Sequence, residues 1–124
     1  MKTCLLSLLL LLSYCFTSVA QSVLPKEDNS IRILSYNVRN GKGMDNITDY
    51  QRVADVINRI APDVVAVQEL DSVTQRNNGV YSLGELAKRT LMHATYAGSI
   101  DYQGGKYGIG MLSKEKPVSY KRVP

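Results

Sequence analysis

The hydrophobic pattern of residues 62–71 is typical of a strand that is buried on both faces. The run Val64–Val67 is continuous and apolar, it is opened by Pro62, and it ends abruptly at Gln68 and Glu69. A short, β-branched apolar run between polar residues favours a strand over a helix. We therefore expect Glu69 at the carboxyl end of a strand, which is the edge where open α/β sheets bind ligands.

A second strand is predicted upstream, over residues 31–38, where apolar and polar positions alternate. The glycine-containing loop Arg39–Gly43 follows it, so Asn37 lies near the end of this strand. Thr48 and Gln51 then have the spacing of a capping box, which marks the start of a helix. The apolar residues of this helix recur on one face and end at a proline: Tyr50, Val53, Ala54, Ile57, Ile60, Ala61 and Pro62.

The order strand, helix, strand predicts the α/β class. A crossover of this length joins two parallel strands in the right-handed sense. The carboxyl ends of both strands then lie at one edge of the sheet. We therefore expect Asn37 and Glu69 to emerge side by side.

The second half of the chain predicts a helix and a hairpin. Ser82 and Glu85 have capping-box spacing. They open a helix with an apolar face made of Leu83, Leu86, Ala87 and Leu91. Residues 93–100 and 106–113 predict two strands joined by a short turn, and residues 118–123 predict the start of another strand.

Residues 1–20 predict a secretory signal peptide. Lys2 supplies the basic start, Leu5–Leu12 the apolar segment, and Ser18–Ala20 a small-residue cleavage site. The apolar segment is too short for a permanent transmembrane helix. Lipidation at Cys15 is the alternative, but the residue before this cysteine is not the small one that a lipoprotein signal has. We therefore expect an exported protein, either periplasmic or secreted.

Composition and charge restrict the function only weakly. Residues 21–30 are polar without periodicity, which predicts a linker before a domain that starts at Ile31. Both cysteines, Cys4 and Cys15, fall in the signal segment, so the exported protein forms no disulfide. The formal net charge is +4 with mostly scattered basic residues. This distribution favours a solvated basic face over a surface for a polyanion.

Asn37 and Glu69 are the candidate site residues. An amide oxygen and a carboxylate at adjacent strand ends are hard ligands of the kind that Mg²⁺ prefers. The same carboxylate could instead form a salt bridge with Arg39 or Arg76. The residues by themselves leave the metal site and the salt bridge as alternatives.

Three segments resemble motifs of the endonuclease/exonuclease/phosphatase family, and they are Leu34–Val38, Pro62–Glu69 and Tyr107–Lys114. In that family the first motif supplies an Asn and the second a Glu at the metal centre, so the resemblance implies these roles for Asn37 and Glu69. The third motif has Lys114 in place of the usual Arg, and we expect its glycines to permit close packing. The resemblance covers residues 31–124.

The resemblance implies the fold and its extent. The expected structure is α/β (α+β), half of a four-layer α/β/β/α sandwich of the DNase I-like type. Residues 31–124 would be the amino-terminal part of the domain. The family's Asp-x-Asn motif and its closing Asp–His pair are absent from these 124 residues. We therefore expect a fragment, an interrupted gene or a truncated chain that is inactive in isolation.

The resemblance also implies a phosphoesterase or phosphodiesterase that uses Mg²⁺, with Mn²⁺ as the alternative metal, and the signal segment implies that it is exported. Gln68 or Arg39 would orient Glu69. Asp71 stands where the deoxyribonuclease-like branch has an Arg that contacts DNA. A carboxylate there would repel a polyphosphate backbone, so nucleic acid is possible but not favoured as a substrate.

The single histidine, His93, is expected at the surface or in packing. The alternative function is a catalytically inactive exported module that binds a phosphorylated lipid, glycan or nucleic acid.

Overall fold

The computed structural model describes residue 23 and residues 25–123. The predicted signal peptide lies outside the described residues. The helices and strands, in chain order, are β1 (Ile33–Asn37), η2 (Arg39–Gly41), α2 (Tyr50–Ile60), β2 (Val64–Ser72), η3 (Gln75–Asn77), α3 (Ser82–Thr90), β3 (His93–Tyr102) and β4 (Gly105–Ser113). No helix in the described part of the chain is long and apolar enough to span a membrane.

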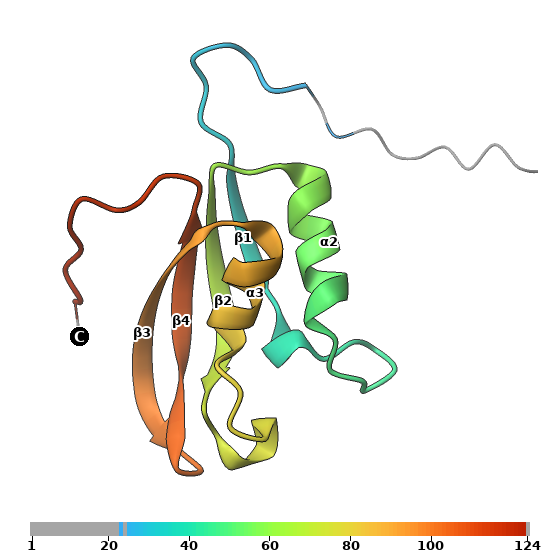
Figure 1. Ribbon diagram of the computed structural model, residues 1–124, viewed down its shortest axis with the longest axis vertical. Coiled ribbons are helices and arrows are strands. Elements are labelled where there is room, and N and C mark those ends of the chain that lie inside the picture. Colours follow the sequence, from blue (N-terminus) through green and yellow to red (C-terminus); the bar gives the residue numbers. More distant parts are fainter. Residues whose placement is uncertain (1–22, 24, 124) are drawn as a thin grey trace, which may run out of the picture.

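The four strands form one sheet in the order β1-β2-β4-β3. β1 and β2 are parallel, and the register pairs Asn37 with Gln68. β4 is antiparallel to both of its neighbours. The parallel β1–α2–β2 unit and the β3–β4 hairpin that the sequence predicts are therefore confirmed, and Figure 1 shows both.

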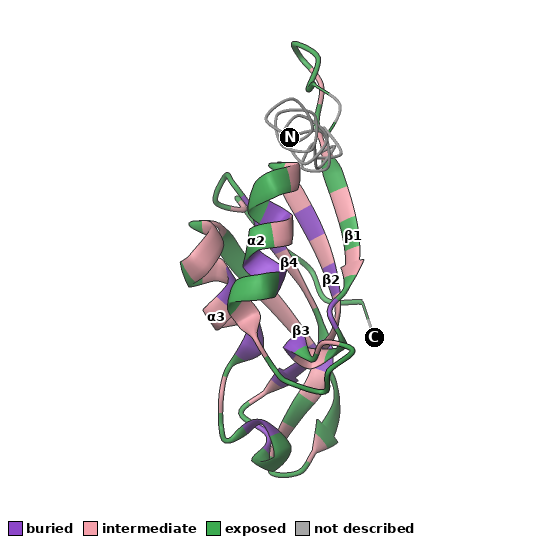
Figure 2. Ribbon diagram, turned by 90° about the vertical axis from the view of Figure 1, so that its right-hand side faces the viewer, coloured by how far each residue is buried: buried purple, intermediate pink, exposed green. Residues whose placement is uncertain are grey.

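Helices α2 and α3 cover one face of the sheet, and the buried residues lie between the two layers (Figure 2). The side chains of this core come from both helices and from the central strands: Val53, Ile57, Val65, Val67, Leu70, Leu83, Leu86 and Leu112. The opposite face is open among the described residues, with Ile33 exposed by 70% and Ile109 by 52%. This two-layer arrangement is the α/β half-sandwich expected from the sequence.

Both predicted capping boxes are wrong. The carboxylate of Asp49, rather than Thr48, caps α2 by accepting from the backbone N–H groups of Gln51 (2.8 Å) and Arg52 (3.2 Å). Asp and Thr are both good N-caps, so adjacent candidates compete at this helix start. Tyr81 is the N-cap residue of α3 and has no side-chain capping bond. Ser82 cannot be the cap, because it lies inside the helix.

Two further expectations about elements are corrected. Leu91 follows α3 in a left-handed conformation and is 91% exposed, so it does not extend the apolar face of that helix. Residues 118–123 form no strand and are exposed. Alternating apolar residues without a neighbouring strand edge do not suffice to form a strand, because the backbone hydrogen bonds need a partner.

Asp63, just before β2, joins three separate segments of the chain. Its carboxylate accepts from Lys26 Nζ (2.7 Å), from the backbone N–H of Arg32 (2.8 Å) and from Lys114 Nζ (3.2 Å). The hydrogen bond from Lys26, followed by the one from Arg32, holds the pKa of Asp63 well below its usual 3.8. The ionised carboxylate therefore ties the segment around Lys26 to the sheet.

We expect acid to weaken this tie. A group with a lowered pKa in the folded state stabilises the fold above its unfolded pKa of about 3.9. This stabilisation is lost as the pH falls toward the folded pKa. Urea unfolding of wild type and Asp63→Asn should therefore show a difference in unfolding free energy at pH 7 that shrinks below about pH 4. A difference that stays constant down to pH 2.5 would refute this role.

Candidate active site

Glu69 lies at a β-bulge in the middle of β2. Val67 pairs with Gly110 and Leu70 pairs with Gly108, so Gln68 and Glu69 together face a single residue of β4. The sequence-based expectation that Glu69 ends the strand is wrong, since β2 continues to Ser72. Bulges of this kind redirect side chains and are common beside active sites.

The backbone of Glu69 is left-handed, with φ of +60°. This conformation costs an L-residue other than glycine roughly 1–2 kcal/mol. Such a conformation persists only where the surrounding structure holds the residue in place. The bulge thus places one carboxylate outside the regular alternation of the strand.

Asn37 and Glu69 are brought together as expected. Asn37 is the last residue of β1, and its Nδ2 donates to Glu69 Oε1 at 2.7 Å. The Oδ1 of Asn37 accepts from the backbone N–H of Arg39 at 3.0 Å, which fixes the amide. Among the described residues, Glu69 Oε2 has no hydrogen-bond or ion-pair partner. Asn37 therefore holds Glu69 in place and leaves one carboxylate oxygen for a ligand.

The salt-bridge alternative for Glu69 is wrong. Arg76 pairs with Asp71, and the guanidinium of Arg39 makes, among the described residues, only long hydrogen bonds of 3.4 Å to Gly43 O and Asn46 Oδ1. Gln68 does not orient Glu69 either, because its amide donates to Ser35 Oγ and Ala66 O. Arg39 helps to orient Glu69 indirectly, because its backbone N–H donates to Asn37. Its guanidinium does not contact Glu69.

A hollow of about 490 Å³ opens beside Glu69. It is lined by residues from η2, the following loop, η3 and the β3–β4 hairpin: Arg39, Asn40, Lys42, Thr48, Glu69, Arg76, Ile100, Tyr102 and Tyr107. Three of these side chains are cationic and only one is a carboxylate. A concave surface with this balance of charge attracts anions.

Asp71 lies behind this hollow and is fully buried. Its carboxylate accepts from Arg76 through Nε (2.7 Å) and Nη2 (2.8 Å), from Thr74 Oγ1 (3.0 Å) and from Asn40 Nδ2 (2.9 Å). Burial raises the pKa of Asp71, but the hydrogen bonds from Arg76 and Thr74 outweigh it and leave the pKa below its usual value. Asp71 is thus a buried, paired carboxylate that does not line the hollow, so it is not the exposed charge on which the expected repulsion of a polyphosphate backbone depended.

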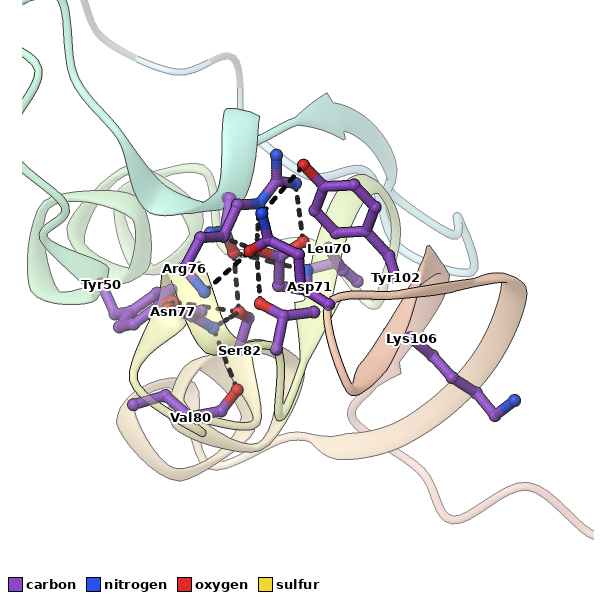
Figure 3. Close-up of polar contacts among 12 residues, drawn as sticks. Tyr50, Leu70, Asp71, Arg76, Asn77, Val80, Ser82, Tyr102 and Lys106 are labelled. Carbon is purple, nitrogen blue, oxygen red and sulfur yellow. Dashed lines mark hydrogen bonds and ion pairs between the residues drawn. The ribbon is translucent and has the colours of Figure 1, made fainter.

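A buried polar network extends from Asp71 to α2 and α3 (Figure 3). Ser82 Oγ donates to Asn40 Oδ1, and Asn77 Nδ2 donates to Ser82 Oγ, both at 2.9 Å. The hydroxyl of Tyr50 donates to Asn77 Oδ1 at 2.9 Å. The loops that line the hollow are therefore fixed to the helical layer by satisfied hydrogen bonds.

Two tyrosines of the hairpin complete the far side of the hollow. The ring centroids of Tyr102 and Tyr107 lie 4.6 and 5.5 Å from Arg76 Cζ. Burial raises the pKa of Tyr107, and the nearby carboxylate of Glu69 raises it further. At neutral pH Tyr107 is therefore a neutral hydrogen-bonding group next to Glu69.

The sequence did not predict that Asp71 and Arg76 pair with each other at this site, or that Tyr102 lines it. Asp71 and Arg76 meet because η3 turns the chain back onto the end of β2, and Tyr102 arrives from another strand. A carboxylate near the end of an apolar segment, followed five positions later by an arginine, was the available signal. His93, the first residue of β3, is exposed. It pairs with Ser113 of β4, which pairs in turn with Val64 at the start of β2, so His93 lies at the end of the sheet away from the bulge.

Solved structures with a similar fold have low sequence identity to this chain. An endonuclease/exonuclease/phosphatase from Beutenbergia cavernae DSM 12333 matches with a TM-score of 0.57 and 21% identity over 73% of this chain and 27% of its own. An endonuclease/exonuclease/phosphatase family protein from Leptotrichia buccalis C-1013-b matches with a TM-score of 0.51 and 20% identity over 70% of this chain and 39% of its own. The chain thus spans well under half the length of either structure.

A family profile matches most of this chain by sequence. None of the curated proteins matches this sequence significantly. The profile of the endonuclease/exonuclease/phosphatase family matches residues 34–124, which include β1, the bulge in β2 and the hairpin. The members of this family are hydrolases that act on phosphoesters. With most of its length matched and the same fold in both solved structures, the chain belongs to the endonuclease/exonuclease/phosphatase family.

Proposed function

We propose that this chain contributes Asn37 and Glu69 to the active site of an exported, Mg²⁺-dependent phosphodiesterase. The observation that carries the proposal is the hydrogen bond of 2.7 Å from Asn37 to Glu69 Oε1, which leaves Oε2 unpaired among the described residues. This oxygen belongs to the residue that the bulge in β2 displaces. Export rests on the signal-like pattern of residues 1–20.

The donor chemistry of the site fits Mg²⁺. Glu69 offers a hard carboxylate oxygen, and Mg²⁺ commonly uses one or two carboxylates while it keeps several waters. No cluster of three or more His, Cys, Asp or Glu side chains occurs within residues 23 and 25–123. Glu69 would therefore hold the ion together with waters, and Mn²⁺ would suit the same oxygen ligands.

The chain's own residues would then prepare the substrate. Bound Mg²⁺ would neutralise charge on the phosphate oxygens and the leaving alkoxide. Asn37 would keep the Glu69 carboxylate aimed at one point, because its amide is itself fixed by the N–H of Arg39. The cationic hollow beside Glu69 would receive the negatively charged phosphoester.

Metal removal tests this proposal. With the full-length protein, hydrolysis of bis(p-nitrophenyl) phosphate should fall to background after EDTA treatment, because the substrate charge is then uncompensated. Added Mg²⁺ or Mn²⁺ should restore it. The monoester p-nitrophenyl phosphate serves as the comparison substrate and should be hydrolysed more slowly. Undiminished hydrolysis by protein shown to be metal-free would overturn the proposal.

A further inference from the structure

Arg76 is held in one orientation by a carboxylate that has no access to solvent. Its Nε and Nη2 form two parallel hydrogen bonds to Asp71, of 2.7 and 2.8 Å, and the Asp71 side chain is 0% exposed. Paired bonds of this kind fix the plane of a guanidinium as well as its position. Asp71 is itself fixed by Thr74 and Asn40. The orientation of Arg76 is therefore built into the fold.

The hairpin limits the remaining freedom of Arg76. The guanidinium lies over the ring of Tyr102, with Cζ 4.6 Å from the ring centroid, and 5.5 Å from that of Tyr107 (Figure 3). Even so, 43% of the Arg76 side chain stays exposed. Among the described residues its Nη1 has no hydrogen-bond partner. One edge of an oriented guanidinium is thus left free.

Arg76 lines the same hollow as Glu69. Asp71 neutralises part of its charge, but Arg39 and Lys42 also line the hollow, and neither forms an ion pair with a described residue. The hollow therefore keeps a surplus of positive charge. A planar donor edge in such a place matches the oxygens of a tetrahedral phosphate.

We propose that Arg76 is a substrate-binding residue, whose free Nη1 edge donates to a non-bridging phosphate oxygen of the phosphoester in the hollow. This inference rests on the proposed function for the identity of the ligand as a phosphoester. Arg76 acts in binding: it holds the phosphate group beside Glu69, while Asp71 and Tyr102 keep the guanidinium in its orientation. Arg39 and Lys42 supply attraction without a comparable fixed geometry.

The test measures the binding of inorganic phosphate to the full-length protein by calorimetry. The buffer contains EDTA and is kept at constant ionic strength. Arg76→Lys keeps the charge but loses the planar fork, so it cannot satisfy Asp71 and the anion together. We expect its phosphate affinity to fall about ten- to hundredfold, the range for one charge-assisted hydrogen bond. The control is Arg59→Lys on the exposed face of α2, which should bind phosphate as wild type does. Equal affinity of Arg76→Lys and wild type, or no binding by wild type, would overturn the inference.

A second variant covers the case in which Arg76→Lys does not fold. The double variant Asp71→Asn/Arg76→Gln removes both charges and keeps a polar partner for each side chain, and it should lose phosphate affinity to the same extent. With bis(p-nitrophenyl) phosphate, Arg76→Lys should raise KM while kcat stays within about twofold. Glu69→Gln separates the two proposals. It should lose hydrolysis and keep phosphate binding in EDTA, so either proposal can fail while the other holds.

Discussion

Replacing Glu69 by glutamine is expected to lower kcat for phosphodiester hydrolysis by roughly 10³-fold or more. Glutamine keeps the shape of the side chain, and its Oε1 can still accept from Asn37 Nδ2, the contact that measures 2.7 Å in the structure. The change therefore removes the negative charge and little else. Stabilisation of transition-state charge by a bound cation is worth several kcal/mol, and each 1.36 kcal/mol is about a factor of ten in rate.

Glu115→Gln is the matched control for this variant. Glu115 is exposed after β4, and within the described part of the chain only its backbone carbonyl takes part in a hydrogen bond, from Ser113 Oγ. Its replacement should leave kcat unchanged. Circular dichroism and thermal unfolding of both variants show whether the fold is kept. Hydrolysis at the wild-type rate by folded Glu69→Gln would refute the role of this carboxylate.

The largest effect on stability is expected from Asp71→Ala. This substitution removes the only carboxylate that Arg76 contacts among the described residues, and it leaves the donors of Thr74 and Asn40 without their acceptor. Removing one partner of a buried ion pair costs about 3–5 kcal/mol. We expect about 3 kcal/mol in the free energy of unfolding, the low end of that range, because Arg76 stays partly solvated.

Asp45→Ala provides a control with similar bonding and different burial. Asp45 also forms two hydrogen bonds with an arginine, of 2.8 and 3.2 Å to Arg52, but both side chains are more than 40% exposed. Exposed pairs contribute about 0–1 kcal/mol, so this variant should be almost as stable as wild type. Urea unfolding of the two variants measures the difference. Equal losses of stability would show that burial of Asp71 does not govern its contribution.

The sequence was sufficient to predict the β1–α2–β2 unit and the meeting of Asn37 with Glu69. The apolar run before Gln68 and the helical repeat before Pro62 are local signals that the core reinforces, since Val65, Val67 and Ile57 are all buried. Parallel strands then bring their ends together by geometry alone. These predictions needed no knowledge of side-chain contacts.

The bulge and the polar network could not be predicted in this way. Glu69 has a positive φ without being glycine, and no local pattern announces a conformation that neighbouring strands impose. Ser82 has the spacing of a helix cap, yet tertiary contacts with Asn40 and Asn77 take its hydroxyl instead. Asp71 and Arg76 are joined by a turn, and their pairing depends on burial that appears only once the helices cover the sheet.

The most direct test of the central claim is a titration of the full-length protein with Mn²⁺, in which NMR spectra are recorded at each step. The claim is that Asn37 fixes Glu69 so that one carboxylate oxygen can hold a hard divalent cation. Paramagnetic Mn²⁺ at Glu69 should broaden the side-chain amide signals of Asn37 at substoichiometric metal, and Glu69→Gln should abolish this broadening. Asn37 signals that stay sharp in wild type, or broaden equally in Glu69→Gln, would contradict the account.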